Sequence, residues 1–522
     1  MRYLRSRAFV LFAILLVYSY VIYKMMHSIS KFKDYSCIIL RCMSVPAFYY
    51  FAIFLLATFY LTASFKLFNC HELCFDVYGS RNCGYLGWLV LVDVVLSSLL
   101  GGIVMVSFSN KFGYDPLFMR FVIERILLNY MLPAVLAILI GFFMAYSFKM
   151  RTGVIFTVIV MYLTSPSFVR EAVTKSDLYK IMAFVQNFEF IQGWDNIYLP
   201  VAVDNVRLYK WLKILGFIAI ASIPVVRIVV KKSKVVICAL LVFFIGCEVF
   251  YYMPQNRAME EYGVLASEAY YFKNGAPSKT ACDSKSPFVI ESYDLDMKFD
   301  HMQHVKCDMK LAKEDTDRGE YTFTLYHTYK ISKITYEGKS VSYNRDGDYV
   351  TVKGLGEGVI HMEYYGVPES YVADSKAITL PEYFPYYPVA GKKQVYGSKG
   401  VMNDYASAYK VRTCVEGLYT NLDKTGDGVY EAVCHGPYLL KGMIKEVEVA
   451  GYKVLMPRYN VGNRVIPEEL IEESVKTLVA HTDTKPKFIC LGMNMTMAYS
   501  LGSYIGDGYI DSPYRAVFEE EK

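Results

Sequence analysis

The chain changes character near Met253. Before that residue come seven long apolar stretches with few charges, and after it about half of the protein is polar and patterned like strands. The first 253 residues hold 24 Lys and Arg against 12 Asp and Glu, whereas residues 254–522 hold 31 against 38. A helix satisfies its own backbone in lipid, while alternating polar and apolar residues suit a sheet that faces water on one side. The sequence therefore predicts a membrane α-helical bundle followed by a soluble domain.

The apolar stretches predict six to seven membrane spans, since a crossing needs about 20 residues at roughly 1.5 Å each. The fifth and sixth are shorter than the second, third and fourth. Arg2, Arg5 and Arg7 precede the first stretch as in a secretion signal, but no cleavage site follows, so we expect a retained span in a 1–253 transmembrane domain. The candidates are Phe9–Met26, Met43–Phe65, Tyr85–Phe108, Ile126–Phe148, Thr152–Val169, Ile214–Val230 and Val235–Met253.

The total basic charge of the loops is nearly equal on the two sides, so the expected orientation rests on one local signal. Lys231, Lys232 and Lys234 form a tight turn between the last two stretches, and cations beside span ends translocate poorly. This predicts a multi-pass protein of the cell membrane with a cytoplasmic amino terminus and an extracytoplasmic C-terminal domain. The net charge of +5 belongs to loops that flank lipid, so membrane lipid is an expected partner and nucleic acid is not.

The second half predicts a mainly antiparallel β-sandwich over 288–460, after a linker over 254–287. Side chains alternate from Tyr293 to Phe299, and turn residues fall at Arg345–Asp348 and Thr425–Gly428. A truncated α/β segment over 461–522 follows, with a helix that begins near Pro467 and a strand at Phe488–Leu491.

Asp93 lies about eight residues into the third apolar stretch. An ionisable group at that depth is costly in lipid, so it is a candidate functional residue. The alternative is a carboxylate close enough to the helix start to reach interfacial water or the helix dipole.

Cys414 and Cys434 are a candidate disulfide. They lie on either side of the turn around Lys424, and if 409–414 pair with 430–434 the two thiols could face each other. Five cysteines in this half leave at least one thiol unpaired.

We expect no metal site and no cofactor. Cys70, His71, Cys74 and Cys83 cluster like zinc ligands, but their spacing fits no closed site, and an amphipathic surface helix is the better interpretation. His301 and His304 lack a third ligand, so we interpret this segment as a polar turn between strands.

The first half resembles type-2 ABC exporter permeases. The likeness covers about residues 1–230 and is carried by the span layout and by the segment from Phe68 to Cys83, which is similar to the loop that docks on the ATPase in that family. It implies coupling to an ATPase through Glu72, Asp76 and Arg81, and a homo- or heterodimer of permeases. The sequence has no G-x-x-x-x-G-K-[ST] loop, so the ABC ATPase would be a separate subunit.

The second half resembles the amino-terminal β domain of gluzincin aminopeptidases. The order of strands from Gly338 to Pro368 and the aromatic-proline run Leu380–Pro388 carry this likeness over about 288–460. The family's H-E-x-x-H zinc motif is absent: the one His-Glu pair is His71-Glu72, on the other side of the break. We therefore expect no catalytic residue and no peptidase activity.

Together these observations predict the permease subunit of an ABC exporter-like complex with a non-catalytic β domain outside the cell. Two alternatives stay open. One is a non-transporting membrane-anchored scaffold or binding protein, and the other is the remnant of a membrane-anchored metallopeptidase.

Overall fold

The computed structural model describes most of the chain. The described residues are 2–36, 39–67, 84–165, 208–253, 271, 273, 282–283, 285–315, 319–369, 371–395, 403–459, 468–492 and 503–512. They fall into two compact units, one built from the helices before Pro254 and one built from the residues after it.

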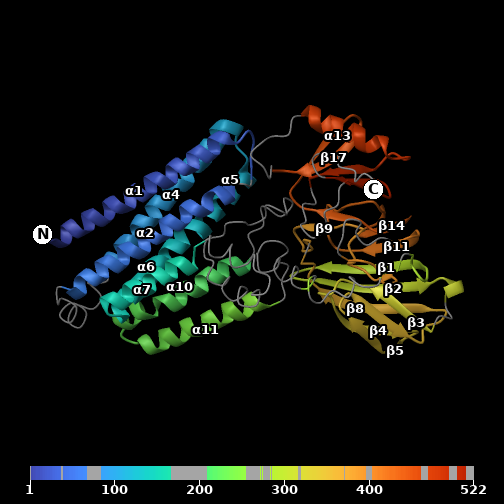
Figure 1. Cartoon of the computed structure of the whole chain (residues 1–522), viewed down its shortest axis with the longest axis horizontal. Coiled ribbons are helices and arrows are strands. Elements are labelled where there is room, and N and C mark those ends of the chain that lie inside the picture. Colours follow the sequence, from blue (N-terminus) through green and yellow to red (C-terminus); the bar gives the residue numbers. More distant parts are fainter. Residues whose placement is uncertain are drawn as a thin grey trace. The chain divides into compact units, whose positions relative to one another are not determined.

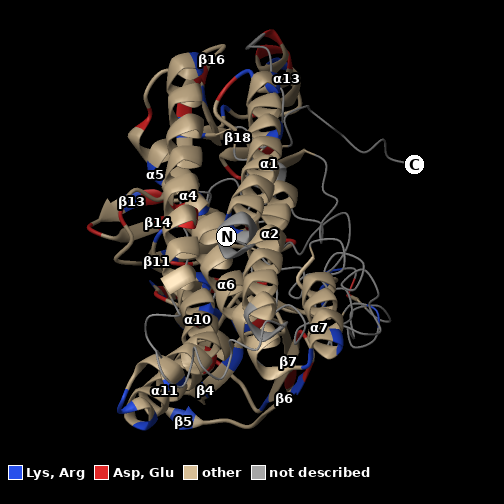
Figure 2. Cartoon of the chain, turned by 90° about the vertical axis from the view of Figure 1, so that its left-hand side faces the viewer, with Lys and Arg blue, Asp and Glu red and all other residues tan. Residues whose placement is uncertain are grey.

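The first unit is a bundle of helices that run alongside one another (Figure 1). Six helical stretches within the described ranges are long and apolar enough to cross a membrane, and α7, with 14 residues, is shorter. Uncharged runs fill the middle of α1, α2 and α6 (Figure 2). The helices are α1 (Arg2–Lys31), α2 (Ile39–Leu67), α4 (Gly84–Phe112), α5 (Pro116–Ile126), α6 (Leu132–Ser147), α7 (Met150–Leu163), α10 (Leu208–Val229) and α11 (Ser233–Tyr252).

Small residues bring α2 and α6 together. A Cβ on Gly141 of α6 would lie 2.5 Å from the Leu55 carbonyl oxygen of α2 and 3.1 Å from the Thr58 Cβ, so only glycine fits this crossing. At one end of α1, the Lys111 ammonium donates hydrogen bonds to the carbonyls of Ile29 and Ser30, both at 3.0 Å. The Ile29 carbonyl also accepts from the backbone N–H of Phe32 at 3.2 Å, and Lys111 caps the last turn of the helix beside it.

A π-helical turn, η1 (Leu127–Met131), joins α5 to α6. Pro133 follows it and has no N–H to donate to the carbonyl of Asn129, so the regular α-helical ladder is interrupted at this point. Such turns widen a helix locally and occur often at functional sites. Asn129 and Tyr130 are fully buried within the turn.

The described residues of the second unit form four sheets (Figure 1). The largest has the strand order β13-β14-β11-β1-β2-β8-β4-β5, and only its β1–β11 pair is parallel. Its strands are β1 (Ile290–Phe299), β2 (Gln303–Leu311), β4 (Lys330–Tyr336), β5 (Lys339–Ser340), β8 (Val359–Gly366), β11 (Ser407–Arg412), β13 (Asp423–Gly426) and β14 (Val429–Cys434). Two smaller antiparallel sheets have the orders β10-β3-β7-β6 and β12-β15-β9, with β3 (Glu320–Thr324), β6 (Tyr343–Asp346), β7 (Tyr349–Lys353), β9 (Ile378–Leu380), β10 (Val389–Ala390), β12 (Tyr419–Thr420) and β15 (Leu439–Lys441).

The alternation expected from the sequence is confirmed. Tyr293, Leu295, Met297 and Phe299 of β1 are all buried, as are the apolar residues of β2. The two predicted turns connect β6 to β7 and β13 to β14.

The fourth sheet is mixed and has the order β16-β17-β18-β20-β19. It contains the predicted strand at Phe488–Leu491, and the predicted helix packs near it through Val475 and Leu478. The sheet spans the expected boundary near residue 460, because β17 pairs with β18 from the last segment, and β16 pairs with β17. Its elements are β16 (Ile444–Val449), β17 (Tyr452–Pro457), α13 (Glu468–Ala480), β18 (Phe488–Leu491), β19 (Tyr504–Gly506) and β20 (Tyr509–Ser512).

Candidate functional site

Asp93 of α4 is fully buried among packed helices. Its Oδ1 accepts a hydrogen bond from the Tyr50 hydroxyl of α2 at 2.9 Å and a second from Ser97 Oγ, one turn along α4, at 3.0 Å. The Tyr50 and Ser97 oxygens are themselves 3.3 Å apart. Among the described residues, Asp93 Oδ2 has no hydrogen-bond partner.

Aromatic side chains surround this carboxylate cluster of Asp93, Tyr50 and Ser97. The Tyr18 hydroxyl of α1 donates to the Leu96 carbonyl at 2.9 Å, and the ring of Tyr130, in the π-helical turn, lies 5.5 Å from the ring of Tyr50. The Tyr130 hydroxyl donates to the Met43 carbonyl at 3.0 Å. Side chains from α1, α2, α4 and η1 therefore meet at one place in the bundle.

Two buried polar groups in these helices have hydrogen-bonding capacity that the described residues do not use. One is Asp93 Oδ2, and the other is the Asn129 side chain in η1, both of whose amide atoms lack a partner within the described ranges. An unpaired buried polar atom costs about 1–3 kcal/mol, so these groups lower the free energy of unfolding of the bundle. Their arrangement suits a site that takes up a proton or rearranges its hydrogen bonds when the helices move.

The predicted coupling residues Glu72, Asp76 and Arg81 lie outside the described residues. So do the cysteines and His71 of the same segment.

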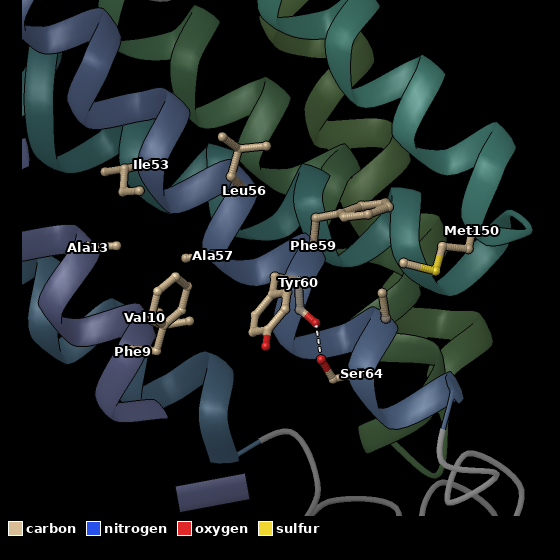
Figure 3. A pocket seen from close by; sticks show the side chains of 11 residues that line it. Phe9, Val10, Ala13, Ile53, Leu56, Ala57, Phe59, Tyr60, Ser64 and Met150 are labelled. Carbon is tan, nitrogen blue, oxygen red and sulfur yellow. Dashed lines mark hydrogen bonds between the residues drawn. The ribbon is translucent and has the colours of Figure 1, made fainter. Parts of the chain in front are cut away.

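An apolar groove of about 290 Å³ lies between α1, α2 and the start of α7 (Figure 3). No ionisable group other than the Tyr60 phenol lines it, and the Ser64 hydroxyl donates to the Tyr60 carbonyl of its own helix at 2.8 Å. The groove therefore offers shape and apolar contact but little polar recognition.

The predicted Cys414–Cys434 disulfide is wrong: both are thiols in the structure, with Cys414 exposed and Cys434 buried. In the antiparallel register of β11 and β14, Cys434 pairs with Ser407, and Arg412 pairs with Val429. The two cysteines therefore lie at opposite ends of this strand pair. The turn near Lys424 joins β14 to β13 and not to β11.

The β unit contains a second buried carboxylate, Glu382, which lines a cavity of about 640 Å³. Its Oε1 accepts a hydrogen bond from the Tyr504 hydroxyl of β19, whereas its Oε2 has no partner among the described residues. Burial raises the pKa of Glu382 to about 8, with hydroxyls of Tyr504 and Tyr509 opposing the rise and Asp507 adding to it.

Asp507, between β19 and β20, lines the same cavity. Its Oδ2 accepts from the backbone N–H of His435 at 2.6 Å and lies 2.8 Å from the His435 Nδ1. Behind them, the Asn403 amide donates to the His435 carbonyl at 2.9 Å. The loop after β14 is thus held against the β19–β20 turn.

One signal in the sequence points to Glu382, because it is the single carboxylate within the aromatic-proline run Leu380–Pro388. Tyr383, Phe384, Tyr386 and Tyr387 in that run are at most 2% exposed. Within the described ranges, no group of three or more His, Cys, Asp or Glu residues is placed to hold a metal ion.

No protein-family model matches the sequence, and no curated protein matches it. Solved structures that align with part of the chain include the M1 zinc metallopeptidase of Deinococcus radiodurans, with 11% identity over 46% of this chain and 63% of that one at a TM-score of 0.30. Native leukotriene A4 hydrolase of Saccharomyces cerevisiae aligns with 10% identity over 47% and 44% of the two chains at a TM-score of 0.29. An aminopeptidase N family protein of Idiomarina loihiensis aligns with 11% identity over 45% and 44% at 0.28.

These proteins belong to the peptidase class that the strand order of the second half resembles. The chain spans 44% to 63% of their lengths. At these TM-scores the alignments carry no conclusion about activity.

Proposed function

We propose that this chain is the membrane-embedded subunit of an exporter-like transport complex driven by a separate ATPase. The observation that carries the proposal is the carboxylate cluster, in which a fully buried Asp93 has one oxygen without a described partner. Helices that only anchor a domain gain nothing from a buried carboxylate, which destabilises them in lipid. The π-helical turn beside it supports a bundle whose helices change their packing.

The resemblance to ABC exporter permeases implies that ATP hydrolysis by a separate ATPase subunit supplies the energy for transport. Glu72, Asp76 and Arg81 would contact the ATPase, and two permease chains would form the complete complex. The test is purification of the intact chain from its native membranes in mild detergent. We expect an ATPase subunit to copurify, and Arg81→Glu to weaken its recovery more than Lys273→Glu. Recovery of no ATPase, while an established transporter prepared in parallel retains its own, would contradict the proposal.

The β unit would lie outside the cell, with Lys231–Lys234 on the cytoplasmic side. This arrangement needs an odd number of crossings, so α7 and the residues after it would complete a span. Cys282 and Cys414 are exposed and provide a test. A membrane-impermeant maleimide applied to intact cells should label the wild type more than a Cys282→Ser/Cys414→Ser variant. Equal labelling of the two before lysis, with a difference only afterwards, would place the β unit in the cytoplasm.

The β unit would bind without cleaving peptides, since the sequence has no H-E-x-x-H motif. Zinc analysis of the purified chain tests this part. We expect far less than one zinc per chain, and near-stoichiometric zinc would favour the metallopeptidase alternative.

A further inference from the structure

The apolar groove between α1, α2 and the start of α7 has the length of a lipid chain (Figure 3). On α2 its lining side chains extend from Ile53 to Ser64. That stretch of helix rises about 16 Å at roughly 1.5 Å per residue, and the hydrocarbon core of a bilayer is about 30 Å thick. The groove is therefore about as long as one leaflet of that core is deep.

Large apolar side chains of this groove are exposed at the surface of the bundle. Phe9, Tyr60 and Met150 line it and are 63%, 44% and 50% exposed. Membrane-spanning helices present such side chains to lipid, which is as apolar as they are. The occupant that suits both this chemistry and the length of the groove is an acyl chain.

An acyl chain alone gives the groove no selectivity, because every lipid tail is similarly apolar. Selectivity must come from a headgroup at one end of the groove. Two contacts identify that end. The rings of Phe9 and Tyr60 lie 6.3 Å apart, and a Cβ on Gly153 would lie 3.0 Å from the ring of Phe59. The beginning of α1, the last part of α2 and the beginning of α7 therefore meet there.

The charges at this end of the groove are positive. Lys149 and Arg151 flank Met150 in sequence, and both are exposed. Arg7 of α1 is half-buried, and its guanidinium lies 5.9 Å from the centre of the Trp88 ring, a residue type favoured among lipid headgroups. None of α1, α2 and α7 contains an Asp or Glu. This end of the groove therefore favours an anion.

We infer that the groove binds an anionic phospholipid, with one acyl chain along α2 and the phosphate beside Lys149 and Arg151. The inference goes beyond the proposed transport function, because it requires the bundle to lie in a membrane but requires neither an ATPase nor a transport step. With a cytoplasmic amino terminus, the phosphate would lie in the cytoplasmic leaflet, whose anionic lipids attract basic groups.

Native mass spectrometry of the full chain in a neutral detergent tests the headgroup. The anionic probe is dioleoyl phosphatidylglycerol, and dioleoyl phosphatidylcholine is its zwitterionic counterpart. Each basic group beside the phosphate contributes about fivefold in affinity, so we expect the anionic lipid to bind at least about tenfold more tightly. Lys149→Gln/Arg151→Gln should remove this preference. Lys231→Gln/Lys232→Gln, the same loss of charge at the exposed turn between α10 and α11, should keep it.

Ala13→Leu tests the acyl chain. Ala13 lines the groove on α1, so the larger side chain fills part of it without a change in charge. We expect both phospholipids to bind at least about threefold more weakly. Ala8→Leu, at an exposed residue of the same helix that does not line the groove, is the matched control and should bind both lipids as the wild type does.

The headgroup preference is a ratio measured on one preparation, so a partly misfolded variant does not imitate its loss. Equal affinity of the wild type for the two phospholipids, an equal loss of preference in the two double variants, or unchanged binding by Ala13→Leu would each overturn the inference. So would competition by glycerophosphoglycerol, the anionic lipid without its chains, because it would show a site for free phosphate. A lack of ATPase copurification would leave the inference standing, so the two proposals fail separately.

Discussion

Each unit buries a carboxylate that accepts a hydrogen bond from a tyrosine, Asp93 in the helical bundle and Glu382 in the β unit, and the surroundings of these two carboxylates differ. Asp93 and Glu382 are 0% and 4% exposed, and each accepts a hydrogen bond from a tyrosine hydroxyl while its second oxygen has no partner among the described residues. Asp93 is enclosed by packed helices, whereas Glu382 lines a cavity. A change in the hydrogen bonds of Asp93 therefore involves the helices around it, whereas Glu382 faces a cavity.

The units also differ in how they are held together. The helical bundle relies on close backbone approach at small residues such as Gly141. The β unit relies on buried tyrosines whose hydroxyls reach distant partners, as Tyr386 does with the Pro437 carbonyl at 2.7 Å. Substitutions that add one methyl group should harm the first unit most, and those that remove one hydroxyl should harm the second.

The largest effect is expected from Gly141→Ala. The added Cβ would lie 2.5 Å from the backbone oxygen of Leu55, which cannot move without shifting α2. We expect a loss of about 3 kcal/mol, measured as a lower thermal denaturation midpoint in detergent. Gly102→Ala is the matched control, because its Cβ would meet nothing within 4 Å. If both variants unfold at the wild-type temperature, close backbone contact does not hold the bundle.

Tyr329→Phe should have a smaller effect, confined to the β unit. The Tyr329 hydroxyl donates to Gln303 Oε1 at 2.6 Å, and both residues are fully buried. The variant therefore leaves the Gln303 oxygen buried without its hydrogen-bond donor. We expect a loss of about 2 kcal/mol in the free energy of unfolding. Tyr343→Phe, at a residue that is 41% exposed, should change it by less than about 0.5 kcal/mol. Equal effects would show that the buried hydroxyl contributes little.

The smallest effect concerns a charged contact on the surface of the β unit. His361 Nδ1 lies 2.5 Å from Asp308 Oδ1 and its Nε2 lies 2.9 Å from Glu363 Oε1. Burial lowers the pKa of His361, but hydrogen bonds to Glu363 and Asp308 outweigh it and raise the pKa above its ordinary value. The contact therefore stabilises the folded chain fully below about pH 6.5, and the contribution is lost as pH rises through the folded pKa.

His361→Gln should remove this pH dependence. The expected change is below about 1 kcal/mol, because the contact is partly exposed. Thermal midpoints at pH 6 and pH 9 measure it, with His301→Gln in the exposed β1–β2 turn as the control. A wild-type midpoint that does not fall relative to the variant between these pH values would exclude a role for the histidine.

Local patterns predicted much of the fold. Alternation identified the buried face of β1, because burial follows the period of the strand, and the helix expected to begin near Pro467 is α13. The register of β11 against β14 could not be predicted, because it is fixed by pairing with the parallel strand β1, more than a hundred residues away in sequence. The mistaken disulfide follows from this.

The candidate sites divide in the same way. Asp93 was identifiable because a carboxylate is rare within an apolar stretch. Its partner Tyr50 was not, since it lies on another helix 43 residues away. Glu382 is hydrogen-bonded to Tyr504, 122 residues away in sequence. The local helical and strand periodicities of the sequence cannot predict a contact at that separation.

The most direct test of the central claim measures ATP hydrolysis by the purified complex with wild-type and Asp93→Asn chains. The amide keeps the shape of the carboxylate but removes its charge, and Glu248→Gln near the end of α11 serves as the control. The account predicts that Asp93→Asn folds and retains the ATPase but lowers its turnover by at least about tenfold, a barrier increase of about 1.4 kcal/mol. Turnover equal to that of the wild type and of Glu248→Gln would show that the buried carboxylate has no part in transport.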